Sequence, residues 1–273
     1  MRNKPLELSL YVAGAGAFGV FLRWMENQLA FDKDLGLAEP SAFHLLFLAF
    51  LLACALVFRH FLRDIDHRRY YIPGEFEKAL FSEHKLHALL SAAAGAAMAL
   101  GGLMLLSKSE IDPFTGMLRL LAALAALSGL AFPLVLAEAR REKIRTGLMC
   151  LLMLLPVLHY AVWLLLSYRN NSISSVPLAY GPDMLTAILA MLAYFHMAGF
   201  AFGTARPSRA LFFVMLSATV CIISLADERY LGMELILVAT AGQMLLYTWI
   251  LLQNLQQKER RVIVKKDDGF EHL

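Results

Sequence analysis

The sequence contains few charged residues and few cysteines for its length. Of its 273 residues, 17% are Asp, Glu, Lys or Arg, 59% are hydrophobic, and three are cysteine. So low a charged fraction excludes an ordinary water-soluble domain, in which about 25% of residues are charged. Cys54, Cys150 and Cys221 lie far apart in apolar stretches. They predict neither a disulfide framework nor a clustered metal site, and we expect them to be small packing residues.

Recognisable catalytic motifs are also missing. The chain has no HExxH zinc motif, no GxSxG nucleophile elbow and no Walker A loop. Glu138, Arg140, Arg141 and Glu142 superficially suggest an intramembrane protease, but their position at the end of an apolar stretch is typical of a charged boundary. We therefore predict no catalytic residue, no metal ligand and no cofactor. An enzyme is the less favoured class.

Long apolar windows are what the sequence has instead. A transmembrane helix needs about 20 consecutive apolar residues, and a β-barrel would need short alternating strands. Eight such windows predict an all-α, polytopic transmembrane bundle, with residues 1–255 as a single domain and 256–273 as a polar tail. The windows lie near residues 8–28, 42–62, 87–106, 117–137, 147–167, 183–204, 210–226 and 231–252.

Charge in the connections predicts the orientation. Lys and Arg near membrane ends favour the cytoplasmic side. They gather before residue 8, in 59–85, 140–145 and 206–209, and in the tail, whereas acidic residues gather in the opposite connections. The pattern predicts that both termini lie in the cytoplasm and that the protein crosses a plasma or inner membrane many times. The net charge of +3 then reflects topology, and we predict contact with a lipid bilayer and none with nucleic acid.

Successive windows predict four helical hairpins. Three of the opposite connections share an acidic residue, three others and then Gly, a pattern that permits a duplicated hairpin. Helix dipoles and tight turns explain the same pattern without duplication. Small residues recur at helical spacing in the first, third and fourth windows, as in Gly95 and Gly129, and predict close helix packing near the centre. The second window, rich in Leu and Phe, is predicted to face lipid.

Ionisable side chains inside the windows are the best candidates for a site, because they are costly in hydrocarbon. Arg23 and Glu26 are one turn apart near the outer end of the first window, and Glu234 lies at a similar depth in the eighth. Together they predict an outward-facing pocket for a charged or zwitterionic solute. Alternatively, Arg23 extends to the headgroups and Glu26 pairs with it.

Three further polar candidates lie nearer the middle of the bilayer. His159 follows Pro156 by three residues, His196 follows Tyr194 by two, and Gln243 shares a helix face with Thr240. Two intramembrane histidines can relay protons or hold a ligand. Each can equally be a hydrogen-bonded packing residue, and the polar face of the eighth window can serve as interhelical hydrogen-bonding groups or line a cavity.

The longest inner connection, residues 63–86, carries aromatic residues and a Pro-Gly break among its charges. It predicts a short interfacial helix and is a candidate docking surface for a protein partner. The leading functional prediction is a transporter or binding protein for a small solute. The alternatives are a non-transporting subunit that scaffolds or regulates a partner, and a membrane enzyme that acts on lipid.

Overall fold

Nine α-helices account for nearly all of the chain that the structure describes. The structure is a computed structural model, and it describes residues 4–30, 42–67, 70–108, 115–141, 145–171 and 177–257. The helices are α1 (Lys4–Leu29), α2 (Ala42–His67), α3 (Phe76–Leu80), α4 (Lys85–Lys108), α5 (Thr115–Glu138), α6 (Thr146–Asn171), α7 (Pro177–Ala201), α8 (Pro207–Ile223) and α9 (Leu231–Gln253). A 3₁₀ turn, η1 (Ser224–Ala226), follows α8, and two short strands are β1 (Tyr70–Tyr71) and β2 (Gln256–Gln257).

Eight of these helices are long and apolar enough to cross a bilayer, and each predicted window falls on one of them. The all-α bundle is therefore confirmed, and the chain is a multi-pass integral membrane protein. One difference in bounds is at the end of the sixth window, predicted at 204. The helix α7 ends at Ala201 because Gly203 adopts a left-handed conformation with φ of 68°, which terminates helices readily.

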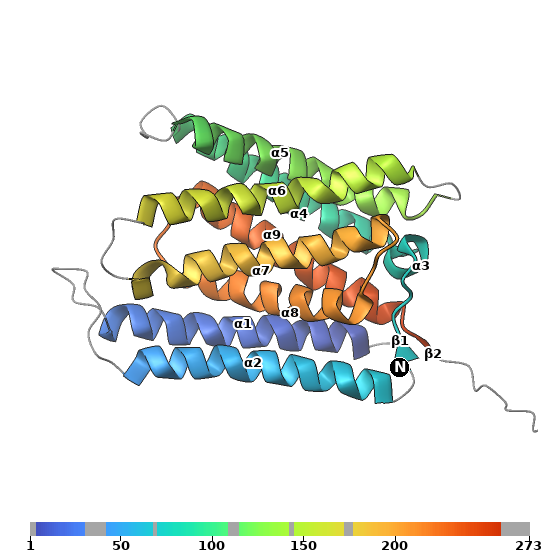
Figure 1. The fold of residues 1–273 in the computed structure, drawn as a ribbon, viewed down its shortest axis with the longest axis horizontal. Helices are drawn as coiled ribbons and strands as arrows, with labels where there is room; N and C mark the ends of the chain where they lie inside the picture. Colours follow the sequence, from blue (N-terminus) through green and yellow to red (C-terminus); the bar gives the residue numbers. More distant parts are fainter. Residues whose placement is uncertain are drawn as a thin grey trace, which may run out of the picture.

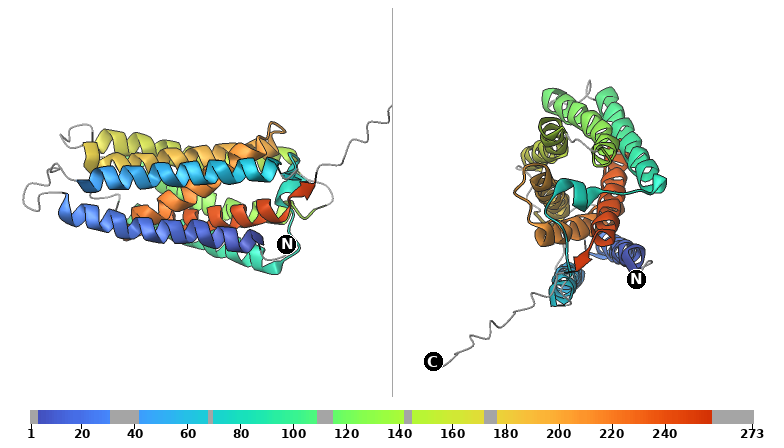
Figure 2. Two further views of the ribbon diagram at one scale, coloured as in Figure 1. Left: turned by 90° about the horizontal axis from the view of Figure 1, so that it is seen from below. Right: turned by 90° about the vertical axis from the view of Figure 1, so that its right-hand side faces the viewer.

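Helices α4 to α9 form a closed ring. Each contacts the next in sequence, and α9 returns to pack against α4. Figure 2 shows the ring from one end, with α6 and α9 on opposite sides. The start of α1, the two short strands and α3 lie at this end of the bundle (Figure 1). We call it the inner end and the other the outer end, following the prediction from charge.

The hairpin of α1 and α2 lies outside the ring, against α8 and α9. Only 17% of the residues in the apolar span of α2 are buried in the protein, in agreement with its predicted exposure to lipid. In the span of α9, 72% of the residues are buried. The small-residue helices are less central than expected, since α1 and α4 are only 28% and 39% buried. Small side chains at these positions bring two helices together rather than mark the centre of the bundle.

Helices α4 and α5 approach each other closely at two glycines. A Cβ atom added to Gly95 would lie 2.2 Å from the carbonyl oxygen of Gly129, and one added to Gly129 would lie 2.4 Å from that of Gly95. Both distances are far below van der Waals contact. Glycine is therefore required at both positions, as the predicted packing of these two windows implies.

The inner connection folds back across the end of the ring. Its apolar side chains Ile72, Phe76 and Leu80 are buried, and α3 contacts both α7 and α9. The predicted short helix is thus present, although it packs into the protein. Strand β1 pairs with β2 at the start of the predicted tail, and residues 258–273 of that tail lie outside the described residues.

Two polar side chains hold this connection in place. Arg140, after α5, donates through Nε to the carbonyl oxygen of Ser82 at 2.7 Å and through Nη2 to that of His84 at 2.9 Å. Asn254, after α9, donates to the carbonyl oxygens of Ala79 and Phe81 at 2.9 and 2.8 Å. Four carbonyl groups at this end of the bundle accept side-chain hydrogen bonds in this way, and that of His84 also accepts from the backbone N–H of His87.

Candidate functional site

A buried network of charged side chains joins the helices at the outer end. Arg23 of α1 contacts Glu26 through Nη1 and Asp227, after η1, through Nε, both at 2.7 Å. Glu26 also contacts Nδ1 of His44 on α2 at 2.6 Å. The side chains of Arg23 and Glu26 are only 3% and 4% exposed. The predicted pair is therefore present, and it is buried in protein rather than extended to headgroups.

The network continues into the ring through Arg229. Its Nη2 atom lies 3.0 Å from Asp227 and 3.3 Å from Asp183 on α7, and its Nη1 donates to the carbonyl oxygen of Ser224. Asp183 also accepts hydrogen bonds from Ser167 Oγ at 2.5 Å and from Trp163 Nε1 at 3.3 Å. A continuous polar path therefore runs from α2 and α1 to α6.

Asp227 takes the place that the sequence suggested for Glu234. Among the described residues, no hydrogen bond or ion pair involves the side chain of Glu234, which lies in the first turn of α9. Asn27, the other polar residue on this face of α1, donates to Asp227 at 3.1 Å. We call the linked residues the outer network: Arg23, Glu26, Asn27, His44, Asp183, Asp227 and Arg229.

One face of α6 lines the interior of the ring along its whole length. Its residues recur at alternating intervals of three and four, which places them on one side of a helix. We call this set the axial face: Thr146, Met149, Met153, Pro156, Tyr160, Trp163 and Ser167. The opposite face carries Leu151, Leu158 and Leu165, which are 51 to 59% exposed. That opposite face meets lipid.

At mid-depth a hydrogen bond crosses the ring. The hydroxyl of Tyr160 on α6 lies 2.5 Å from the hydroxyl of Thr240 on α9, and both side chains are fully buried. Nearby, Ser91 of α4 donates to Oε1 of Gln243 at 3.1 Å. The polar face predicted for the eighth window is therefore used for bonds between helices, and it also faces the ring interior.

The two predicted histidines have different surroundings. His159 is fully buried, and its Nδ1 lies 3.1 Å from the carbonyl oxygen of Leu121 on α5. His196 is partly exposed and stacks on Phe213 of α8, with ring centroids 5.0 Å apart. His159 thus belongs to the seam between α5 and α6, and the structure does not bring His196 into the outer network.

Four aromatic rings are stacked along the axis. Phe132 of α5 stacks on Tyr194 of α7, Tyr194 on Tyr160, and Tyr160 on Trp163, with centroids 5.5 to 5.9 Å apart and interplanar angles of 12 to 19°. Trp163 then donates to Asp183 of the outer network. The stack connects the middle of the ring to its outer end.

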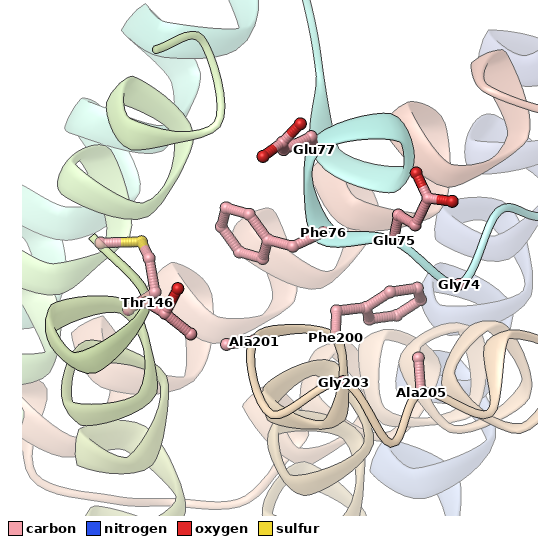
Figure 3. Close-up of a pocket in the computed structure, with 10 residues that line it drawn as sticks. Gly74, Glu75, Phe76, Glu77, Thr146, Phe200, Ala201, Gly203 and Ala205 are labelled. Atoms are coloured by element: carbon pink, nitrogen blue, oxygen red, sulfur yellow. The ribbon is translucent and has the colours of Figure 1, made fainter. Parts of the chain in front are cut away.

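The inner end of the ring opens into a cavity of about 540 Å³. We call it the inner vestibule; α3 forms one wall and the ends of α6 and α7 form the others (Figure 3). Glu75, Phe76 and Glu77 come from the folded-back connection, and Thr146 and Phe200 from the ring. A hydrogen bond to Glu75, and its charge, raise the pKa of the neighbouring Lys78, so the ammonium group of Lys78 stays protonated.

Between the vestibule and the stack lies a second, much smaller space of about 10 Å³. We call it the central cavity, and its lining comes from α5, α6, α7 and α9. The lining residues are Ala131, Phe132, Val135, Leu152, Met153, Pro156, Tyr194, Met197 and Tyr247. Its volume is that of a single water molecule. In this conformation, side chains therefore close the middle of the ring.

The described residues contain no group of three His, Cys, Asp or Glu side chains placed to hold a metal ion. Comparisons with protein-family models, characterised proteins and solved structures find no match to this chain. Sequence reasoning missed His44, Asp183, Asp227 and Arg229, because they lie at the ends of windows or in connections. Only their charge beside an apolar helix end was available as a signal.

Proposed function

We propose that this protein transports a small polar solute along the axis of the ring, between the inner vestibule and the outer network. The axial face of α6 carries the proposal. Thr146 and Met149 line the vestibule, Met153 and Pro156 line the central cavity, and Trp163 and Ser167 reach Asp183. One face of α6 thus lines both the inner vestibule and the central cavity and contacts Asp183 of the outer network.

The two ends of this axis are closed to different degrees. At the outer end, the ion pair of Arg229 with Asp183 joins the connection before α9 to α7 and seals the ring, while the inner end is hollow. A structure sealed at one end and hollow at the other is what a carrier presents when it faces one side of the membrane. The hydrogen bond between Tyr160 and Thr240 closes the middle.

Proline supplies a place for the axis to open. Pro156 lies in the middle of α6 and lines the central cavity. It cannot donate to the carbonyl oxygen of Leu152, so α6 is weakened at this point. A bend there moves Met153 relative to Tyr160 and widens the centre of the ring.

The burial of the inner connection favours transport over a scaffolding role. Phe76 and Leu80 are 8% and 0% exposed, so these apolar side chains are already occupied by the protein's own helices. A connection that serves mainly as a docking surface would present them to water. Here α3 instead covers one side of the vestibule (Figure 3).

Thiol accessibility along α6 tests this proposal. In a background with Cys54, Cys150 and Cys221 replaced by alanine, single cysteines at Met149 and Met153 are compared with one at Leu151. N-ethylmaleimide labels thiols that water can reach, because the thiolate is the reactive form. In inside-out vesicles, we expect labelling at 149 and 153 and little at 151.

A closed axis gives a different result. If the cysteine at Met153 reacts no faster than those at Leu151, Leu158 and Leu165, the centre of the ring is permanently dry and the transport proposal is wrong. Labelling at Met149 alone would show a vestibule that leads nowhere and would favour the scaffold function.

A further inference from the structure

The proposed transport axis has a distinctive chemistry at its narrowest point. Three aromatic side chains from three helices, Phe132, Tyr194 and Tyr247, line the central cavity together with the thioethers of Met153 and Met197. Aromatic faces carry negative partial charge and attract cations, and cages of such rings bind quaternary ammonium groups. Methionine adds a soft, polarizable and flexible wall.

The axial face of α6 carries no cation that would repel a positively charged solute. On the axial face of α6, the residues between Thr146 and Ser167 are all uncharged. Glu75 and Glu77 are among the residues that line the vestibule, and Glu75 pairs with Lys78 at 2.7 Å. The outer end of the aromatic stack meets the carboxylate of Asp183. Among the residues that line the vestibule or contact the axial face, the charged ones are therefore carboxylates, and two of them have cationic partners in Lys78 and Arg229.

The outer arginines do not reverse this pattern. Arg23 lies between Glu26 and Asp227, and Arg229 lies between Asp227 and Asp183, so three carboxylates accompany two guanidinium groups. Asp183 is the member of the network that touches the axial face, through Ser167 and Trp163. It is the first ionised group that a solute leaving the aromatic stack would meet.

One polar group in the central cavity is also unused. The hydroxyl of Tyr194 is buried and has no hydrogen-bond partner in the described part of the chain. Buried hydroxyls without a partner are uncommon, because they lose their hydrogen bonds to water.

From this cavity, and on the basis of the proposed transport function, we infer that the solute is a small organic cation of the substituted-ammonium class. Its positive group binds among Phe132, Tyr194 and Tyr247, at the centre of the ring. The cavity holds only about 10 Å³ in this conformation, so binding requires Met153 and Met197 to move aside.

Charged thiol reagents of similar size measure this preference directly. The cysteine at Met153 is treated with a trimethylammonium-ethyl methanethiosulfonate and with the corresponding anionic sulfonate. Each rate is divided by the rate with free 2-mercaptoethanol, which removes intrinsic reactivity. We expect the cationic reagent to be favoured about tenfold at Met153, since aromatic faces and carboxylates both attract it.

Protection experiments identify the groups that bind. Tetramethylammonium, choline and phenyltrimethylammonium are tested for slowing the N-ethylmaleimide reaction at the same cysteine. Glycine betaine and 3,3-dimethylbutan-1-ol serve as the zwitterionic and neutral counterparts. We expect at least one cation to protect at about a tenth of the concentration that the neutral alcohol needs.

Paired substitutions at one ring provide the matched control. Tyr194→Phe keeps the aromatic face and is expected to keep protection, whereas Tyr194→Leu is expected to weaken it about fivefold. Tyr247→Phe and Tyr247→Leu repeat the test on α9, in case one pair fails to fold. If the cations protect the cysteine equally well in the Leu and Phe variants at both positions, the proposed aromatic site is wrong.

The outcomes separate the two proposals. If the cysteine at Met153 is inert to every reagent, the transport axis itself is wrong. If it reacts, but equally with both charges and without protection by any of the three cations, the axis stands and the cationic class is wrong. Preferential protection by glycine betaine would likewise show that the proposed cationic class is wrong, without contradicting the proposed transport axis.

Discussion

Replacing Arg23 by methionine should strongly destabilise the protein, because this residue neutralises two carboxylates in a buried place. The guanidinium lies 2.7 Å from both Glu26 and Asp227, and its side chain is 3% exposed. Methionine keeps the apolar stem and removes the charge. The side chain of Glu26, which is only 4% exposed, then loses its guanidinium partner. Breaking a buried pair from one side costs about 3–5 kcal/mol.

We expect the free energy of unfolding to fall by about 3 kcal/mol, at the low end of that range, because His44 still contacts Glu26. Adding Glu26→Gln to Arg23→Met should recover about half of this loss, since the buried carboxylate is then neutral. The free energy of unfolding is measured by titrating detergent micelles with sodium dodecyl sulfate and following tryptophan fluorescence.

The exposed pair of Lys78 and Glu75 provides the control. These side chains are 56% and 67% exposed, so Lys78→Met should leave the free energy of unfolding unchanged. The reasoning is refuted if the free energy of unfolding of the Arg23→Met variant is within about 1 kcal/mol of that of the unsubstituted protein. It is also refuted if the double variant is no more stable than the single one.

Three further outcomes are expected. Gly95→Ala should destabilise the bundle by about 1–3 kcal/mol through its clash with Gly129, and Gly14→Ala, with nothing within 4 Å, should not; both are read from the same titration. Arg140→Met should speed hydrogen exchange of the amides in 79–84 about tenfold by releasing two carbonyl oxygens, whereas Arg141→Met, whose side chain is 52% exposed, should not. A fluorescent protein fused after Leu273 should fluoresce, while alkaline phosphatase fused there should be inactive, if the inner end is cytoplasmic; the reverse result would contradict the predicted orientation.

Hydropathy determined most of what could be predicted about the fold. Each apolar window became one helix, because backbone groups in lipid must be paired within the segment. The order of helices around the ring could not be read in this way. It depends on contacts between residues far apart in the sequence, such as Tyr160 with Thr240, and single windows carry no record of their partners.

The candidate site was predicted only where its chemistry is local. Arg23 and Glu26 are three residues apart on one helix, so their pairing follows from helical spacing. Asp227 and Arg229 follow a 3₁₀ turn and looked like ordinary loop charges, yet the turn brings them against α1. The axial face of α6 was partly visible as Tyr160 and Trp163 beside His159, but periodicity alone does not say which face of a nearly uniform apolar helix looks inward.

The closure of the ring by α9 has a consequence for how the protein is made. Helix α9 leaves the ribosome after the other five ring helices, and it carries Thr240 and Gln243, the partners of Tyr160 and Ser91. Until it inserts, those hydroxyls face the bilayer or an open ring without their final partners. Nascent chains that stop before Leu231 therefore expose polar groups within the membrane, and such chains are natural targets for membrane proteases and insertion chaperones.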